Sequence, residues 1–393
     1  MSNHSNLKKE LITVVRNNMR QYTMIVALLF IWGLFWAVTG GVFLSSRNLS
    51  NLFMQMVTIA ILTHGMLLVM VAGNIDLSVG SVCGTLGALV AWLMVTKGLG
   101  PVPAILITLL AGLAVGLWHG FWIALRGVVS WVVTLSSMLA FKGLTLLITK
   151  GQTIGEFKPG FKSIGQEYFL NSVFEGKALS QFTAALFGIA LVAFIISEIR
   201  TRMKRIRNGF SVLSMPFAIA KIAIISAGII VMGWIMSSYR GIPNSVIILI
   251  IVASVYIIIT TRTRFGRHVY AIGGNMEAAR LSGINIRKTI MGICISIGLM
   301  SSIAAIVFTS RLNAATTAAG SLFELDAIAA CIIGGTATTG GIGTIFGALI
   351  GALVMASLDN GMALMDLPVM YQYTVKGLVL LFAVWIDMIN RKK

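Results

Sequence analysis

Charged residues are scarce in this sequence. They make up 11% of its 393 residues, whereas hydrophobic residues make up 57%. Soluble domains carry about a quarter charged residues, so this scarcity excludes an ordinary soluble globular protein. Acidic residues are the rarer kind, with 12 Asp and Glu against 30 Lys and Arg. The long apolar runs between the charges predict an all-α polytopic membrane protein.

Several signatures of chemistry are also missing. The three cysteines lie in apolar runs, without the spacing of a zinc site or of a disulfide framework. The phosphate-loop pattern G-x-x-x-x-G-K-[ST] is absent, so the chain does not hydrolyse ATP by that route. No Ser/His/Asp set or carboxylate pair has a spacing that argues for catalysis. We therefore expect a protein that is not an enzyme and that has no catalytic residue, cofactor or metal.

Twelve apolar segments account for most of the chain, which predicts about 10–12 transmembrane helices. They cover 22–44, 52–72, 82–95, 102–125, 130–149, 181–196, 216–236, 246–260, 289–309, 325–333, 345–357 and 373–386. The first is too long for a cleaved signal peptide, so we expect it to be retained. These segments define a transmembrane domain at 22–390, between a polar N-terminal segment at 1–21 and a short tail at 391–393.

The basic residues predict how the chain is oriented. The net charge of +18 would suggest a nucleic-acid partner in a soluble protein, but here the Lys and Arg residues flank apolar spans. With both termini in the cytoplasm, about 19 of them lie inside and about 8 outside, as the positive-inside rule requires. The loop at 150–178 is then periplasmic, and the basic loops at 199–213 and 262–288 are cytoplasmic. No nucleic-acid partner is expected.

Two regions of the chain resemble each other. Ile75-Asp76-Leu77 opens one and Leu325-Asp326-Ala327 the other, and each is followed by a short Gly-containing span. Each region ends in a span that contains Lys-Gly-Leu, at 142–144 and at 376–378. An offset of seven spans gives the copies opposite orientations, so we predict an inverted repeat with broken helices, as in transporters. The alternative is that Gly-rich apolar segments resemble one another by composition alone.

Five polar residues beside interrupted spans are candidates for a pathway: Asp76, Ser78, Asp326, Asp359 and Asn360. A carboxylate in an apolar run is costly unless it caps a helix or faces water or a partner. Asp76 is therefore either the N-cap of the next span, supported by Ser78, or a pathway residue. Four carboxylates are expected near the outer face, where they form an acidic vestibule or only cap helices. They are Glu324, Asp326, Asp359 and Asp366.

The segment 273–285 is the longest clearly polar, helix-competent stretch in the second half of the chain. Asn275 can cap the first amides of a helix, and Glu277 suits its first turn. Gly283 can end the helix. We predict about two helical turns between two spans, suited to receive a push from a soluble partner. The alternative is a surface loop that is merely helical.

Three motifs resemble one known family. They are Gly-Asn-Ile-Asp-Leu-Ser-Val-Gly-Ser at 73–81, Tyr-Ala-Ile-Gly-Gly-Asn-Met-Glu-Ala-Ala-Arg-Leu-Ser-Gly-Ile-Asn at 270–285 and Leu-Asp-Ala-Ile-Ala-Ala-Cys-Ile-Ile-Gly-Gly-Thr at 325–336. They resemble the permeases of bacterial ABC importers for ribose, galactose and xylose, and the resemblance covers almost the whole chain. The regions 150–240 and 355–362 most resemble the D-xylose permeases of that family.

The resemblance implies a sugar-transporting homodimer in the bacterial inner membrane, with ABC ATPase subunits on the cytoplasmic side and a sugar-binding protein in the periplasm. Asp359 and Asn360 would suit sugar hydroxyls. The helix at 275–283 would couple the permease to the ATPase through Asn275, Glu277, Ala279, Arg280, Leu281, Ser282 and Gly283. The alternative is an ion-gradient-driven secondary transporter of a small polar solute, which Asp76 and an inverted repeat would also suit.

Overall fold

The computed structural model describes residues 19–171, 173–174, 176–210, 212 and 214–391, and this part of the chain is almost wholly helical. Most of the predicted polar N-terminal segment and of the C-terminal tail lies outside the described residues. Nine described helical segments are long and apolar enough to cross a membrane. They are α3 (Ser46–Val71), α4 with η2 (Val79–Thr96), α5 with η3 (Pro101–Leu125), α6 (Ser130–Thr149), α8 (Lys177–Arg207), α9 (Met215–Ser237), α10 (Asn244–Arg262), α13 (Ile286–Leu312) and α15 (Ile345–Leu364).

Three further helices complete the set of predicted spans: α2 (Met19–Val38), α14 (Phe323–Ile333) and α16 (Val369–Arg391). Every predicted apolar segment therefore contains a helix. α14 has 11 residues, which at 1.5 Å per residue is about half the length that a bilayer requires. The chain is thus a multi-pass helical protein in which one apolar helix is too short to span.

The predicted loops are more helical than expected. The basic stretch at 199–213 was predicted to be a loop, but α8 continues to Arg207, because Lys and Arg are good helix formers and suit a helix C-terminus. The loop at 262–288 contains two helices, α11 (Arg264–Gly274) and α12 (Met276–Leu281). The loop at 150–178 contains α7 (Pro159–Gln166) and β1 (Ile154–Gly155), which pairs antiparallel with β2 (Ala314–Ala315).

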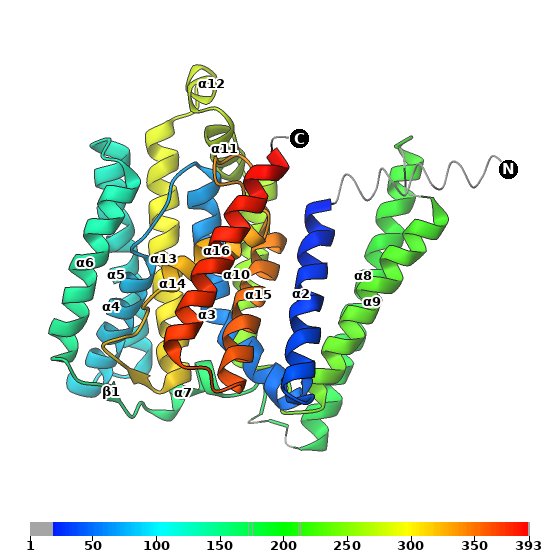
Figure 1. The fold of residues 1–393 in the computed structure, drawn as a ribbon, viewed down its shortest axis with the longest axis horizontal. Coiled ribbons are helices and arrows are strands. Elements are labelled where there is room, and N and C mark those ends of the chain that lie inside the picture. The colour runs from blue at the N-terminus through cyan, green and yellow to red at the C-terminus, as the bar shows by residue number, and fades with distance from the viewer. Residues whose placement is uncertain (1–18, 172, 175, 211, 213, 392–393) are drawn as a thin grey trace.

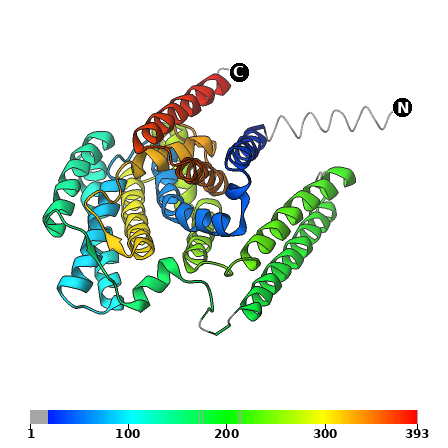
Figure 2. The ribbon, with the colours of Figure 1, turned by 60° about the horizontal axis from the view of Figure 1, so that its bottom comes forward.

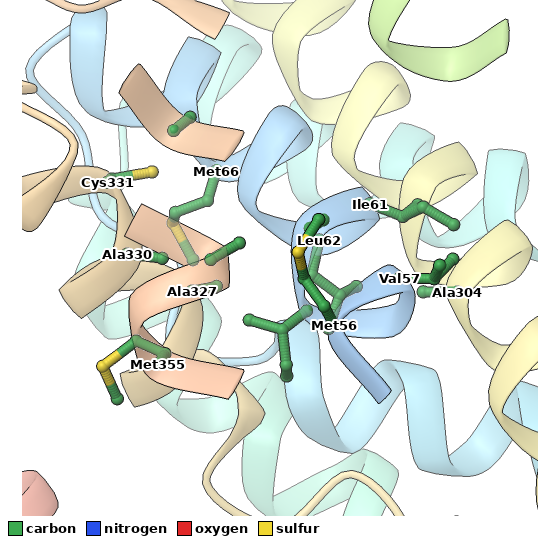
Figure 3. Packing of buried hydrophobic residues seen from close by; sticks show 14 of the residues in the cluster. Met56, Val57, Ile61, Leu62, Met66, Ala304, Ala327, Ala330, Cys331 and Met355 are labelled. Carbon is green, nitrogen blue, oxygen red and sulfur yellow. The ribbon is translucent and has the colours of Figure 1, made fainter. Parts of the chain in front are cut away.

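The central helix of the bundle is α3, which is buried along almost its whole length. α13, α14 and α15 all pack against it. Figure 3 shows Val57 and Ile61 of α3 facing Ala304 of α13, while Met66 faces Ala330 of α14. α8 and α9 form a hairpin that stands at one side of the bundle, beyond α2 (Figures 1 and 2).

Glycines allow the closest helix contacts. A Cβ atom on Gly112 of α5 would lie 2.6 Å from the carbonyl oxygen of Gly298 in α13. A Cβ atom on Gly351 of α15 would overlap the carbonyl group of Ala330 in α14. Small residues at such spacings let membrane helices approach to backbone contact, where van der Waals packing and interhelical contacts replace the hydrophobic effect. These contacts hold α14 in place although it is short.

Candidate pathway and coupling sites

α4 and α14 both begin among buried residues inside the bundle, and their first turns meet. α4 follows the segment 72–78, and α14 follows the turn at 316–322. A Cβ atom on Gly80 would overlap both the Glu324 carboxylate and the Gly320 carbonyl oxygen. Two helix N-termini, with their unpaired amides and positive dipole ends, therefore lie together within the apolar bundle.

Asp76 lies just before the first turn of α4 and is 4% exposed. Its Oδ1 accepts hydrogen bonds from the Ser78 backbone N–H at 2.7 Å and from the Ser78 hydroxyl at 2.6 Å. The N-cap residue of α4 is Ser78, whose side chain caps no amide of the first turn. The N-cap alternative for Asp76 was therefore wrong, because Oδ1 of its carboxylate accepts from Ser78 in a local turn instead of from an amide of the first turn of α4.

We expect Asp76→Ala to impair transport severely. The change leaves the buried hydroxyl and N–H of Ser78 without their acceptor, which costs about 1–3 kcal/mol for each unsatisfied group. Asp366→Asn is the control, since Asp366 is exposed at φ 51 in the turn after α15 and Asn tolerates that backbone. The measurement is uptake per inserted molecule in proteoliposomes. Equal uptake by the two variants would contradict a role for the turn at Asp76.

A partly buried lysine joins three helices. Nζ of Lys376 in α16 lies 3.0 Å from Oδ2 of Asp326 in α14 and 2.8 Å from Oδ1 of Asp359 in α15. The side chains of Asp326, Lys376 and Asp359 are 3%, 17% and 34% exposed. Two carboxylates thus share one ammonium group, and Oδ1 of Asp326 has no hydrogen-bond partner among the described residues. Charged groups inside the bundle are costly unless they are paired, so these three side chains depend on one another for their stabilisation.

The four acidic residues predicted to form a vestibule do not gather on one surface. Asp326 and Asp359 are paired with Lys376, Glu324 lies against Gly80, and Asp366 is exposed beyond the end of α15. The prediction also ended the span before Asp359, whereas α15 continues to Leu364 and carries Asp359 inside the helix. The acidic-vestibule prediction was therefore wrong, and the sequence argument missed Lys376, whose position inside a span was the available signal.

Asn360 and its neighbour Asp359 both belong to α15, but their side chains contact different helices. Asn360 is 4% exposed, its Oδ1 accepts from Asn48 at 2.8 Å, and its Nδ2 donates to Oε1 of Gln55 at 3.3 Å. Both partners belong to α3. This chain of amides forms a polar track between α3 and α15 within the apolar bundle.

The short helix α12 is present as predicted. Oδ1 of Asn275 accepts the Ala278 N–H at 2.9 Å. At the other end Gly283 adopts φ +83, its N–H donates to the Arg280 carbonyl, and the Ile284 N–H donates to the Ala279 carbonyl. This pair of bonds is a Schellman motif, which ends the helix sharply. The cap, the first-turn Glu277 and the terminating glycine all act locally, so the sequence was sufficient to predict them.

α12 lies at the extreme end of the molecule (Figure 1). Its surface is partly apolar: Leu281 is 79% exposed and Met276 is 47% exposed. Arg280 forms an ion pair with Glu277 at 2.8 Å, and both side chains are well exposed. Ala279, in contrast, is buried. Apolar and charged side chains are thus exposed side by side on α12.

The preceding helix, α11, connects α12 to the bundle. A Cβ atom on Gly273 would overlap the carbonyl oxygen of Val71, the last residue of α3. The same Val71 oxygen accepts the Gly341 N–H at 2.8 Å, and the Tyr270 hydroxyl donates to the Gly343 carbonyl at 2.7 Å. Burial raises the pKa of Tyr270, so its hydroxyl remains a donor. α11 therefore contacts both the end of α3 and the glycine-rich turn between α14 and α15.

The comparisons with known proteins agree with this architecture. Residues 48–384 match the family described as the permease component of the branched-chain amino acid transport system. The chain belongs to this family, whose members are the membrane components of ABC transport systems rather than their ATPases. An ABC permease of this kind acts with ATPase and binding-protein components.

The curated relatives narrow the resemblance. The chain is 43% identical to the xylose transport system permease protein XylH of Escherichia coli K12, over 96% of this chain and 93% of the relative. It is 42% identical to XylH of Haemophilus influenzae, over 96% and 98%. The ribose import permease protein RbsC of Bacillus subtilis is 32% identical, over 93% and 91%. No solved structure gives a significant match. The resemblance read from the three motifs is thus confirmed.

Proposed function

We propose that this chain is the pathway-forming permease of an ATP-driven sugar importer and that its sugar is D-xylose. The observation that carries the proposal is the near full-length identity of 43% and 42% to two xylose permeases, against 32% to a ribose permease. Because the alignment covers more than nine-tenths of the chain, it includes the pathway helices as well as the coupling region.

The proposal includes an orientation in the bacterial inner membrane. The start of α2, the end of α16 and α12 all lie at one end of the bundle, whereas α7 and β1 lie at the other (Figure 1). The basic C-terminal end of α8, with Arg205 and Arg207, lies at the same end as α12. The positive-inside rule favours the cytoplasm for that end and the periplasm for the end with α7.

The proposal assigns the transmembrane domain at 22–390 an inverted repeat that relates α3–α6 to α13–α16. The packing supports it: α5 packs on α13 as α15 packs on α3, and α6 packs on α4 as α16 packs on α14. The broken helices would be α4 and α14, whose first turns meet. In such transporters the pathway lies where the repeats meet. We therefore keep Asp76, Ser78, Asp326, Asp359 and Asn360 as pathway residues.

We also propose that α12 seats in a groove of the ATPase and that the permease acts as a homodimer, so that two copies of α12 serve two ATPase subunits. The contact would comprise Asn275, Glu277, Ala279, Arg280, Leu281, Ser282 and Gly283. Closure of the ATPases on ATP must then favour one orientation of the pathway by differential contact with α12.

Arg280→Glu is expected to uncouple ATP hydrolysis from transport while the protein still inserts. The exposed Arg280–Glu277 pair contributes at most about 1 kcal/mol to stability, so reversing the charge leaves the fold intact. It changes only the surface that the ATPase would meet. The measurement is binding-protein-dependent uptake together with ATPase activity in proteoliposomes. Arg126→Glu, beyond the end of α5 and outside the α12 surface, is the control. Normal coupled uptake by Arg280→Glu would contradict the assignment.

The decisive test of the proposed function is reconstitution with the cognate ATPase and periplasmic binding protein. We expect uptake of labelled D-xylose that requires ATP and both partners, with little uptake of ribose. Uptake by the permease alone, driven by a proton or sodium gradient, would overturn the proposal. ATP-driven uptake of ribose in place of xylose would retain the importer and replace its sugar.

A further inference from the structure

A polar cavity of about 380 Å³ opens at the end of the bundle opposite α12. It lies where the start of α3, the end of α7, the turn between α9 and α10 and the end of α13 come together (Figures 1 and 2). Its lining residues are Asn51, Met54, Gln55, Gly165, Gln166, Tyr168, Tyr239, Arg240 and Arg311. The volume falls within the range of about 300–1,000 Å³ that is usual for small-molecule sites.

The wall of the cavity is fixed by hydrogen bonds between segments far apart in the sequence. The Gly165 N–H donates to the Ser310 hydroxyl at 2.8 Å, and that hydroxyl donates to the Phe161 carbonyl at 2.6 Å. Nε2 of Gln166 donates to the Arg311 carbonyl at 3.0 Å. α7 is thereby held against α13, so the cavity is a formed feature of the fold and not a gap between loose loops.

The lining chemistry is that of a site for a neutral polyhydroxyl ligand. Asn51 and Gln55 offer amide groups that both donate and accept, which matches hydroxyl groups, since these also do both. Tyr168 and Tyr239 lie edge to face, with ring centroids 6.1 Å apart, and present aromatic surface for the C–H face of a sugar ring. Burial raises the pKa of Tyr168, which keeps its hydroxyl protonated as a donor.

The two arginines add donors without acid partners. No acidic residue is among those that line the cavity in the described part of the chain, and Nε of Arg311 is buried there without a hydrogen-bond partner. An anion would use these donors but would offer none to the amide oxygen of Asn51, whereas Oε1 of Gln55 already accepts from Asn360. A sugar hydroxyl can serve both kinds of group at once, so the lining as a whole favours a neutral sugar over an anion.

The cavity continues into the bundle through amide groups. Oε1 of Gln55 accepts from Asn360, whose own Oδ1 accepts from Asn48. Asn360 directly follows Asp359, the half-exposed member of the Lys376 cluster. Amide side chains thus lead from the cavity wall into the interface between α3 and α15.

We propose that this cavity is a sugar-binding site on the permease itself, which receives a monosaccharide in pyranose form before it enters the pathway. This inference rests on the proposed function, because it presumes that the end with α7 faces the periplasm and that the solute is a sugar. It goes beyond that function in assigning the permease a site of its own at Asn51, Gln55, Tyr168, Tyr239 and Arg311.

The test uses the full-length permease in nanodiscs, without its partners, and saturation-transfer NMR with D-xylose as the probe. We expect xylose signals from the wild type, and binding about tenfold weaker in Tyr239→Leu, which loses an aromatic face and a hydroxyl together. Asn51→Leu is the second variant, which removes an amide on α3. Tyr371→Leu is the matched control, because Tyr371 is an exposed tyrosine near the start of α16, outside the cavity.

Uptake by the complete importer separates the possible failures. Relative to the wild type, we expect both cavity variants to show a higher Km for the sugar-loaded binding protein or a lower maximal uptake rate. We expect Tyr371→Leu to match the wild type in both. ATP-driven xylose uptake that is unaffected by Tyr239→Leu and Asn51→Leu would overturn the cavity site and leave the proposed function standing. Binding of sulfate in place of xylose would overturn it in favour of an anion site. Absence of any sugar uptake by the wild type would instead refute the proposed function.

Discussion

Lys376→Met is expected to destabilise the protein by about 3–5 kcal/mol, the cost of leaving a buried charge without its partner. In this case two carboxylates lose the same partner, since Asp326 and Asp359 both lie within 3.0 Å of the Lys376 ammonium group. The unpaired carboxylate of Asp326 should cost more stability than that of Asp359, because its side chain is 3% exposed and water cannot replace the lysine. The measurement is thermal unfolding of the purified permease in detergent.

Two comparisons make this prediction specific to the buried cluster. Lys221→Met removes a lysine from the Glu198 pair, which is 2.7 Å long and whose side chains are 45% and 29% exposed, so its cost should be about 1 kcal/mol or less. The triple variant Lys376→Met, Asp326→Asn, Asp359→Asn removes all three charges and should recover most of the lost stability. Equal melting temperatures for Lys376→Met and Lys221→Met would show that the cluster is not an electrostatic unit.

The same variants separate stability from transport. If the carboxylates serve the pathway as well as the fold, the triple variant should be stable and still transport poorly. If it transports normally, Asp326 and Asp359 act only to hold α14, α15 and α16 together. Either result shows whether the cluster around Lys376 serves transport or only the stability of the fold.

The helices of this protein could be predicted because each depends on its own stretch of sequence. A run of about 20 apolar residues has few alternatives to a membrane helix, since lipid cannot satisfy an exposed backbone. α12 was equally predictable, because Asn275 and Gly283 act on amides and carbonyls within one turn of themselves. The local signals therefore determined where the helices lie and how the short one begins and ends.

The contacts that give those helices a function join distant parts of the chain. Lys376 meets a carboxylate 50 residues away, and Asn360 meets Asn48 across 312 residues. Asp76 shows another limit of local reasoning: an N-cap was one of the two alternatives for it, yet its Oδ1 accepts from the backbone N–H and the hydroxyl of Ser78 instead. A single sequence shows that a charged residue lies in an apolar segment but not which residue it pairs with, so the pairing of these polar positions was missed.

The link between α12 and the bundle passes through two adjacent glycines that differ sharply in their surroundings. A Cβ atom on Gly273 would overlap the Val71 carbonyl oxygen and lie 2.6 Å from the Gly341 nitrogen, whereas a Cβ atom on Gly274 would meet nothing within 4 Å. Val71 ends α3, and Gly341 belongs to the turn between α14 and α15. A displacement of α12 would therefore reach the end of α3 and the turn between α14 and α15 through one backbone contact.

Gly273→Ala is expected to reduce ATP-driven uptake by about tenfold, which corresponds to a loss of about 1.4 kcal/mol of coupling free energy. The added methyl group forces α11 away from α3 and breaks the hydrogen bond from Gly341 to Val71, so the motion of α12 is no longer transmitted. Uptake and ATP hydrolysis are measured together in proteoliposomes, and hydrolysis should persist.

Gly274→Ala supplies the control, since it adds the same atoms one residue further on, where alanine even favours the helical backbone by about 1 kcal/mol. It should transport at the wild-type rate. If Gly273→Ala hydrolyses ATP and imports sugar as well as Gly274→Ala does, the motion of α12 reaches the pathway through another contact. Loss of both activities only in Gly273→Ala, with normal insertion, would place the contact in assembly with the ATPase rather than in transmission.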